Sequence, residues 1–197
     1  MNSVLRFLIG VAGALSFAVP AWADPLKLTG TVFDSATKLP LEGAYVVAIY
    51  EEWRANIGMS THICVKLKGM TTGPDGRFDF PVEKRDGVSP SDAIAIKPGY
   101  YLDHLGRMPD LDEIRRQSPA AYANRDIYLA PQKPDSPKLT RYSMDNVLCS
   151  YAKSRADVEP GIQYLRIIAD EKRKYGADKR ALSDMEYLIS DLEEVGR

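Results

Sequence analysis

Residues 44–53 read AYVVAIYEEW, a run rich in β-branched and aromatic side chains. This composition favours a β-strand. A strand that is apolar on both faces is typical of the middle of a sheet, because a half-exposed strand alternates polar and apolar residues. The run therefore predicts a central strand, and the flanking sequence is expected to supply its neighbours.

Shorter strand signals lie on both sides of this run, separated by turn-forming residues such as DSATKLP at residues 34–40 and TGPDG at residues 72–76. The expected flanking strands cover residues 27–33, 63–72, 77–82, 93–97 and 126–129. The segment after the TGPDG turn is expected to complete a hairpin with the strand before it. Six or seven strands joined mostly by turns predict a mainly β fold, an antiparallel sandwich.

The sequence changes character after the strands. Residues 131–137, PQKPDSP, are rich in proline and predict a stiff linker over residues 131–141. Residues 142–197 then predict about three short amphipathic helices that pack on the sandwich. These helices are expected from Ser143 to about Ala156, from about Asp157 and Pro160 to Gly176, and from Asp178 onward.

Three motifs, in this order along the chain, resemble the carboxypeptidase regulatory-like domain. They are GTVFDSATKLPLEGAYV at residues 30–46, TGPDGRFDF at residues 72–80 and IKPGY at residues 96–100. The resemblance covers about residues 27–130 and implies a seven-strand antiparallel, transthyretin-like (Ig-like) sandwich, here assigned to residues 24–130. Such domains are appended to peptidases, receptors and surface proteins, and the motifs carry no catalytic residue. The resemblance therefore implies a binding or structural module.

Residues 1–23 have the features of a cleavable secretory signal: Arg6 near the start, an apolar run over residues 7–19, and small residues around Trp22. A membrane anchor is the alternative, but the apolar run is shorter than the roughly 20 residues that cross a bilayer. We expect cleavage near Ala23 and a periplasmic or secreted chain without a transmembrane span.

The whole chain has 197 residues, of which 45% are hydrophobic and 27% charged, with a formal net charge of −1. This composition excludes a disordered or collagen-like chain. The small net charge gives no general attraction to nucleic acid or to an anionic bilayer. A basic cluster at residues 171–175 and 179–180 is interpreted as helix-end charges that complement the helix dipole, with a nucleic-acid or lipid patch as the alternative.

The chain has two cysteines, Cys64 and Cys149. In an oxidising compartment an even number of cysteines favours a disulfide, here one that fixes the helical tail to a strand. Two buried thiols are the alternative. A zinc site is not expected, because it needs four ligands and the chain adds only His62 and His104 to the two sulfurs.

The usual catalytic and nucleotide-binding motifs, GxSxG, HExxH, GxxxxGK[ST] and GxGxxG, do not occur. We therefore expect no enzymatic activity, catalytic residue, cofactor or metal. A small hydrolase or metal site around His104 is the alternative, because carboxylates suitable for a divalent cation surround it at Asp103, Asp110 and Asp112.

Residues 100–123 form a long insertion of mixed composition. Long connections inside a compact domain are commonly functional. The apolar residues of this insertion are sufficient to order it against the body, and its arginines form a charged rim. Covering the open end of the sandwich is the alternative role. We expect partner contacts through Tyr100, Tyr101, Arg107, Arg115 and Arg116.

These features predict a secreted or periplasmic, non-enzymatic module of a Gram-negative bacterium. Such a module recognises an envelope protein or a cell-wall or glycan ligand. An immunity or inhibitor protein directed against a toxin or a peptidase has the same size and compartment, and the sequence does not separate it from the first hypothesis.

Overall fold

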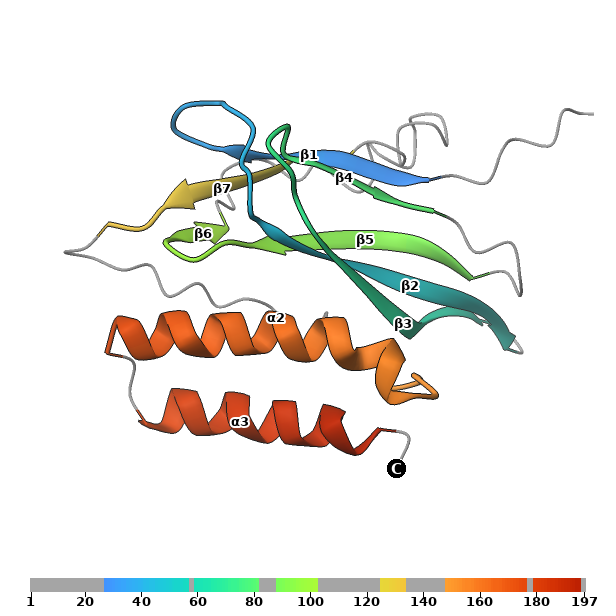
Figure 1. Cartoon of the computed structure of the whole chain (residues 1–197). Helices are drawn as coiled ribbons and strands as arrows, with labels where there is room; N and C mark the ends of the chain where they lie inside the picture. The colour runs from blue at the N-terminus through green and yellow to red at the C-terminus, as the bar shows by residue number, and fades with distance from the viewer. Residues whose placement is uncertain are drawn as a thin grey trace, which may run out of the picture.

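The computed structural model describes residues 27–56, 59–81, 88–102, 125–133, 148–176 and 179–195. In this part the chain forms two β-sheets with two helices stacked on one side (Figure 1). The elements are β1 (Leu28–Asp34), β2 (Tyr45–Asn56), β3 (Met59–Thr71), β4 (Arg77–Phe80), β5 (Val88–Ile96), β6 (Tyr100–Leu102), β7 (Ile127–Pro131), α2 (Arg155–Lys174) and α3 (Lys179–Glu194). The predicted mainly β fold with an α appendage is confirmed.

Strand β2 is central in its sheet, as predicted, because the strand order is β3-β2-β5. Residues 45–50 are all buried, since each face of β2 contacts a different layer. Val46 and Ala48 belong to the core between the two sheets, whereas Val47 and Ile49 belong to the core beneath the helices. This alternation follows from the two-residue period of a strand.

The predicted hairpin between residues 63–72 and 77–82 is wrong. Strand β4 pairs antiparallel with β1 rather than with β3, and Leu28 lies opposite Phe80. The sheet order is β4-β1-β7-β6, so the turn at residues 72–76 carries the chain from one sheet to the other. The turn residues predict a reversal of the chain but do not specify the strand that it will pair with.

Two features fix this crossing turn. Thr72 is buried, and its hydroxyl donates to the Leu41 carbonyl at 2.7 Å and accepts from the Ala44 N–H at 3.0 Å. Gly76 has a φ of 66°, and a Cβ there would lie 2.6 Å from the Val32 carbonyl oxygen. The turn therefore requires a buried hydroxyl and a glycine at these positions.

The sequence predicts antiparallel pairing throughout, but β1 and β7 run parallel, with Val32 opposite Ile127. Short turns impose antiparallel pairing only on strands that they join. Because these two strands are far apart in the chain, no turn constrains their relative direction. Strand β6 was not predicted, since its bounds, Tyr100–Leu102, enclose too few residues for a periodic signal.

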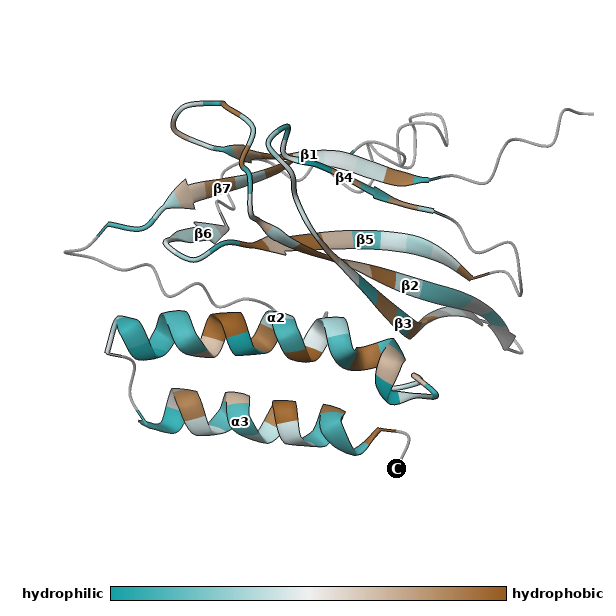
Figure 2. Cartoon of the chain, in the orientation of Figure 1, coloured by the Kyte–Doolittle hydropathy of each residue, from teal (hydrophilic) through white to brown (hydrophobic). Residues whose placement is uncertain are grey.

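Helix α2 buries one side against the three-stranded sheet, and α3 packs on α2. The buried residues of α2 recur at helical spacing: Val158, Gly161, Ile162, Tyr164, Leu165, Ile168 and Ala169. Figure 2 shows the apolar residues of α2 and α3 in bands along otherwise hydrophilic helices. These two helices correspond to the second and third predicted helices.

The first predicted helix, from Ser143 to about Ala156, is not formed over residues 148–154. Turns occupy this stretch, with Ser150 N–H bonded to the Leu148 carbonyl and Ala152 N–H to the Cys149 carbonyl. The earlier part of that prediction lies outside the described residues. The turns direct the Cys149 side chain toward the sheet before α2 begins.

The predicted disulfide between Cys64 and Cys149 is confirmed, with a Cα–Cα distance of 5.0 Å. It joins β3 to the turns before α2, and Cys149 is 1% exposed. The described helices include none that is long and apolar enough to cross a membrane. The predicted signal over residues 1–23 and most of the predicted linker lie outside the described residues.

Candidate functional site

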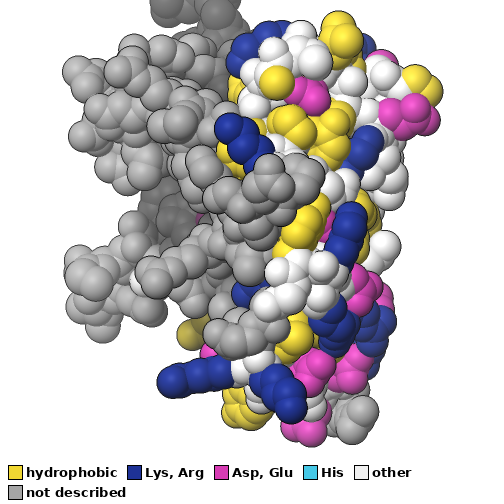
Figure 3. Space-filling view, turned by 90° about the vertical axis from the view of Figure 1, so that its left-hand side faces the viewer, with side chains coloured by type: hydrophobic (Ala, Val, Ile, Leu, Met, Phe, Trp, Pro, Cys, Tyr) yellow, Lys and Arg dark blue, Asp and Glu magenta, His cyan; other side chains and the backbone are white. Residues whose placement is uncertain are grey.

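Four chain segments lie at the end of the molecule where β7 and α2 finish, on the left in Figure 1 and facing the viewer in Figure 3, with the turn after β1 in the upper layer and the last turn of α2 in the lower one. They are the turn after β1, the turn between β5 and β6, the strand β7 and the last turn of α2. We call this region the lysine–tyrosine end and define it by Lys38, Lys97, Tyr100, Tyr128, Lys174 and Tyr175.

Asp34 organises the turn after β1. Its Oδ1 accepts hydrogen bonds from the N–H groups of Ala36 at 2.8 Å and Thr37 at 3.0 Å. This arrangement is one that aspartate favours at the start of a turn. The hydrogen bond from the Thr37 N–H holds the pKa of the Asp34 carboxyl below its ordinary value. The carboxylate therefore stays ionised and anchors the turn that presents Lys38.

Tyr100 links this turn to β6. Its hydroxyl donates to Oδ2 of Asp34 at 3.2 Å, and its half-buried ring packs against the core between the sheets. Burial, together with the hydrogen bond to Asp34, raises the pKa of the Tyr100 phenol, which therefore stays a donor. Tyr101 is the next residue of β6 and points to the opposite face of the strand.

Three lysine ammonium groups lie over tyrosine rings at this end. The distances from Nζ to the ring centroid are 5.1 Å for Lys38 and Tyr128, 5.7 Å for Lys97 and Tyr100, and 5.4 Å for Lys174 and Tyr175. The ring of Tyr128 is itself stacked on Phe33. A cation–π contact restrains an ammonium group but leaves its charge in place.

The last turn of α2 joins the same network through Glu171. Its Oε2 accepts a hydrogen bond from the Gly99 N–H at 2.9 Å, and its Oε1 lies 3.9 Å from Nζ of Lys174. Gly99 has a φ of 81°, a backbone angle that residues with a side chain rarely adopt. The turn between β5 and β6, which carries Lys97 and Tyr100, is thereby fixed to the helix.

The acids Asp34 and Glu171 of this end bond to backbone groups, whereas Lys38 and Lys97 are not paired with a carboxylate in the described residues. Asp34 and Glu171 accept hydrogen bonds from backbone N–H groups. In the described residues no carboxylate forms an ion pair with Lys38 or Lys97, although Lys97 also donates to the Glu42 carbonyl. Figure 3 shows basic side chains on this face from the strand loops to the helices, interspersed with acidic and hydrophobic ones. Neighbouring segments add Lys133, Lys172, Lys179 and Arg180.

A second charged cluster lines a shallow groove of about 390 Å³ between α2 and α3. Its charges compensate one another: Arg166 lies 2.7 Å from Glu193, and Arg173 lies 2.9 Å from Glu186. A further carboxylate, Asp170, lies 2.7 Å from Arg173. Exposed pairs of this kind contribute little to stability. Because its arginines are already paired, the groove is a helix–helix contact rather than a candidate binding site.

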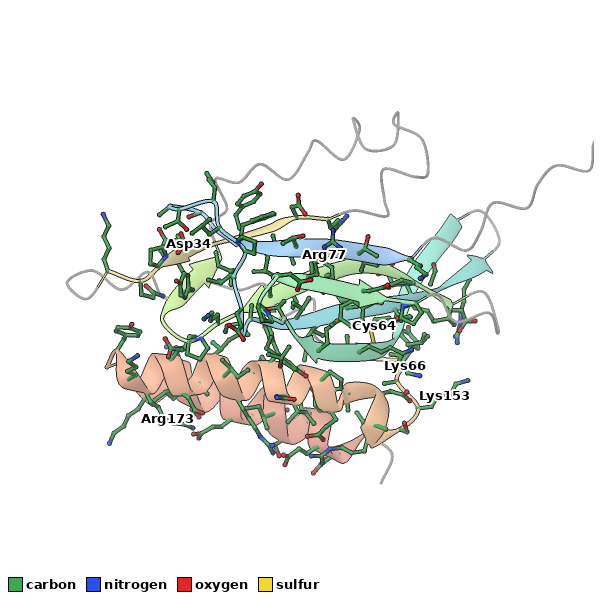
Figure 4. The ribbon with its side chains drawn as sticks, turned by 45° about the horizontal axis from the view of Figure 1, so that its top comes forward. Asp34, Cys64, Lys66, Arg77, Lys153 and Arg173 are labelled. Atoms are coloured by element: carbon green, nitrogen blue, oxygen red, sulfur yellow. A yellow bond between two sulfur atoms is a disulfide. The ribbon has the colours of Figure 1, made fainter. Side chains whose placement is uncertain are left out.

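The opposite end of the molecule holds the disulfide, and we call it the disulfide end, defined by Arg54, Cys64, Cys149, Tyr151 and Lys153. Figure 4 shows Cys64, Lys66 and Lys153 on the side away from Asp34 and Arg173. Here Tyr151 is 53% exposed, and the Arg54 guanidinium lies 5.6 Å from its ring. The Arg54 charge is compensated by Glu52 at 3.5 Å.

An ion pair between Arg125 and Asp92 connects the two sheets. Only 22% of the Arg125 side chain and 26% of the Asp92 side chain are exposed, and burial lowers the pKa of Arg125. The Arg125 carbonyl also packs so closely on β1 that a Cβ at Gly30 would lie 1.8 Å from its oxygen. These contacts give the pair a structural role.

The predicted site residues are only partly described. Tyr100 and Tyr101 lie on β6, and Tyr100 belongs to the lysine–tyrosine end. Arg107, Arg115 and Arg116 lie outside the described residues, as does His104, so their proposed roles stay predictions. His62 is placed opposite Trp53 in the strand register. The described residues contain no group of three or more His, Cys, Asp or Glu side chains suited to a metal ion.

The sequence indicates only part of this surface. The basic cluster at residues 171–175 contains Lys174 and was interpreted as helix-end charge. Lys38 and Lys97 lie within the turn motifs, and neither belongs to a basic cluster that would indicate a binding role. The proximity of Lys97 to α2 depends on the contact between Gly99 and Glu171, which joins positions 72 residues apart.

Comparisons with known proteins do not identify this chain. No family model matches the chain, and no curated protein matches it. A solved structure, a 9R-lipoxygenase from Cyanothece PCC8801, is similar at 17% sequence identity and a TM-score of 0.27. The match covers 73% of this chain and 24% of that one, so the chain spans about a quarter of the lipoxygenase. A similarity at this level carries no argument about fold or function.

Proposed function

We propose that this chain is a secreted or periplasmic, non-enzymatic binding module that recognises a component of the cell envelope. In this proposal the two sheets form a seven-strand, transthyretin-like sandwich related to carboxypeptidase regulatory-like domains, and the helices are an appendage that stabilises it. The three sequence motifs support the family assignment. The covalent link between β3 and the turns before α2 supports a compartment that allows disulfides.

The observation that carries the proposal is the set of unneutralised ammonium groups at the lysine–tyrosine end. Lys38 and Lys97 come from different loops, which Asp34 and Tyr100 hold together. Loops held on a rigid framework are where proteins commonly place binding residues. A surface whose contact groups are already fixed loses less entropy when it binds.

The chemistry of this end suits binding better than catalysis. A general base works best when its pKa is close to the working pH. The Asp34 carboxyl has a lowered pKa, and the Tyr100 phenol beside it has a raised one. Both groups therefore keep one protonation state near neutral pH, which favours a role in holding loops rather than in transferring protons.

Photo-crosslinking tests this proposal. A benzoylphenylalanine replaces Leu39, which is 64% exposed beside Lys38, and in a matched control it replaces Tyr187, which is 67% exposed on α3. Each variant is irradiated with isolated envelopes of the source organism. We expect an adduct from position 39 and none from position 187. Equal adducts from the two positions, or none from position 39, would contradict a binding function located at this end.

A further inference from the structure

The lysine–tyrosine end presents positive charges that the described chain compensates only in part. Lys38 and Lys97 each lie over a tyrosine ring, and the network that places them uses its acids internally. Lys174 shares Glu171 with the Gly99 N–H, so its charge is only partly compensated. An array of cations held in this way attracts an anion.

We propose that the lysine–tyrosine end binds an acidic polysaccharide, with the ammonium groups of Lys38, Lys97 and Lys174 pairing with its carboxylates. This inference rests on the proposed function and specifies its ligand. The end is a binding surface for a chain of anionic sugars rather than for a protein.

The distribution of charge fits an extended polyanion. The three lysines come from the turn after β1, the turn between β5 and β6, and the last turn of α2. Charges spread over separate segments are suited to repeated anionic groups along one ligand. Lysine serves this purpose as a compact point charge, whereas a single enclosed carboxylate is better matched by the fork of an arginine.

The surface exposes few of the apolar anchors that protein interfaces use. Stable protein interfaces bury aromatic or aliphatic anchors at their centre. The large hydrophobic side chains that are exposed in the described residues are Leu39, Tyr151 and Tyr187. Of these, only Leu39 is near the lysine–tyrosine end. Ammonium groups provide hydrogen bonds for sugars without such anchors.

Binding of a defined polyanion tests the inference. The probe is polygalacturonate, which carries a carboxylate on each sugar; neutral dextran and poly-L-glutamate serve as comparison ligands. We expect the full chain to bind polygalacturonate and not dextran. Affinity should fall about tenfold between about 50 mM and 200 mM salt, because the release of counterions condensed on the polyanion favours binding less at higher salt.

A charge-reversal variant locates the binding. Lys38→Glu, Lys97→Glu and Lys174→Glu together should weaken polygalacturonate binding by about tenfold or more at low salt. The matched control changes the net charge by the same amount at exposed positions outside this end: Lys27→Glu, Arg77→Glu and Lys153→Glu. Its affinity should stay within about threefold of the wild type, as screening of distant charges implies. If circular dichroism shows that the charge-reversal variant is unfolded, a triple glutamine variant replaces it. This variant combines Lys38→Gln, Lys97→Gln and Lys174→Gln and keeps hydrogen-bond donors.

Three results would overturn the inference: no binding of polygalacturonate, equal losses in the two triple variants, or tighter binding of poly-L-glutamate than of polygalacturonate. The last result assigns the surface to an acidic protein segment. A crosslink to a protein from position 39 without polysaccharide binding contradicts this inference but supports the proposed function. The absence of both contradicts the two together.

Discussion

The two ends of the molecule are held together by different chemistry. At the disulfide end a covalent bond joins β3 to the turns before α2, and Arg54 is paired with Glu52. At the lysine–tyrosine end, hydrogen bonds and cation–π contacts connect four segments, and the lysines keep their charge. The covalent link lies at the end where the arginine is paired, and the proposed binding groups lie at the end where Lys38 and Lys97 have only ring contacts.

Helix α2 connects these two ends, because it begins beside the disulfide and finishes at Glu171 and Lys174. Its buried side packs on β2, β3 and β5 along its length. At its far end the helix holds the turn between β5 and β6 through the hydrogen bond from the Gly99 N–H to Glu171. Substitutions at either end, or in the helix between them, therefore test this division.

The largest effect is expected from removing the covalent link. The double variant Cys64→Ala and Cys149→Ala should lower the free energy of unfolding by about 4 kcal/mol, because the bond closes a separation of 85 residues in the unfolded chain. Urea denaturation measures the loss, and reduced wild type should match the variant. A loss below about 1 kcal/mol would show that the helices hold without the bond. Polygalacturonate binding by the folded fraction should persist.

The next largest effect is expected in the middle of α2. Leu165 is fully buried in the core beneath the helices, and Leu165→Ala should cost about 3 kcal/mol through lost burial and a cavity. The exposed neighbour Gln163 provides the control, and Gln163→Ala should change stability by less than about 0.5 kcal/mol. Similar costs for the two variants in thermal or urea unfolding would contradict the packing of α2 on the sheet.

A smaller and pH-dependent effect is expected at Asp34. Its carboxyl has a lowered pKa in the folded chain, so it stabilises the fold above its unfolded pKa and loses this contribution as pH falls through the folded value. Asp34→Asn should therefore cost about 1 kcal/mol at neutral pH, after screening by solvent, and progressively less below about pH 4.

Urea denaturation of the wild type and of Asp34→Asn at several pH values measures this difference. Asp79 provides the control carboxylate: it is exposed on the edge strand β4, and its Oδ2 lies 3.7 Å from Nζ of Lys27. Asp79→Asn should change stability little at any pH. We expect the difference in free energy of unfolding between the wild type and Asp34→Asn to shrink in acid. A difference that grows in acid would refute the anchoring role of the carboxylate.

The smallest effect on stability is expected from the lysines themselves. Lys38→Gln should change the free energy of unfolding by less than about 0.5 kcal/mol, because an exposed cation–π contact is weak. The same substitution should nevertheless reduce polygalacturonate binding measurably. A stability loss as large as that of Leu165→Ala would mean that Lys38 is a structural residue.

Local patterns in the sequence predicted most of the elements. The alternation of polar and apolar residues located β1, β3 and β4, the run that is apolar on both faces located β2, and the helical spacing located α2 and α3. The two cysteines predicted the disulfide because no other partner was available to either. Each of these features depends on residues that are close in the chain or on a choice between very few alternatives.

Long-range features were not predictable in the same way. The pairing of β4 with β1 depends on how Thr72 bonds to Leu41 and Ala44, which the turn motif alone does not reveal. The parallel pairing of β1 and β7 has no local signal either. The lysine–tyrosine end depends on such contacts too, so its lysines were visible in the sequence but their grouping was not.

The most direct test of the contrast between the two ends is an NMR titration of the isotope-labelled chain with polygalacturonate. We predict that the amide signals that shift belong to the turn after β1, the turn between β5 and β6, β7 and the last turn of α2. Amides near Cys64 and Cys149 should stay unchanged. Shifts centred on the disulfide end, or spread evenly over the described chain, would contradict the assignment of binding to the lysine–tyrosine end.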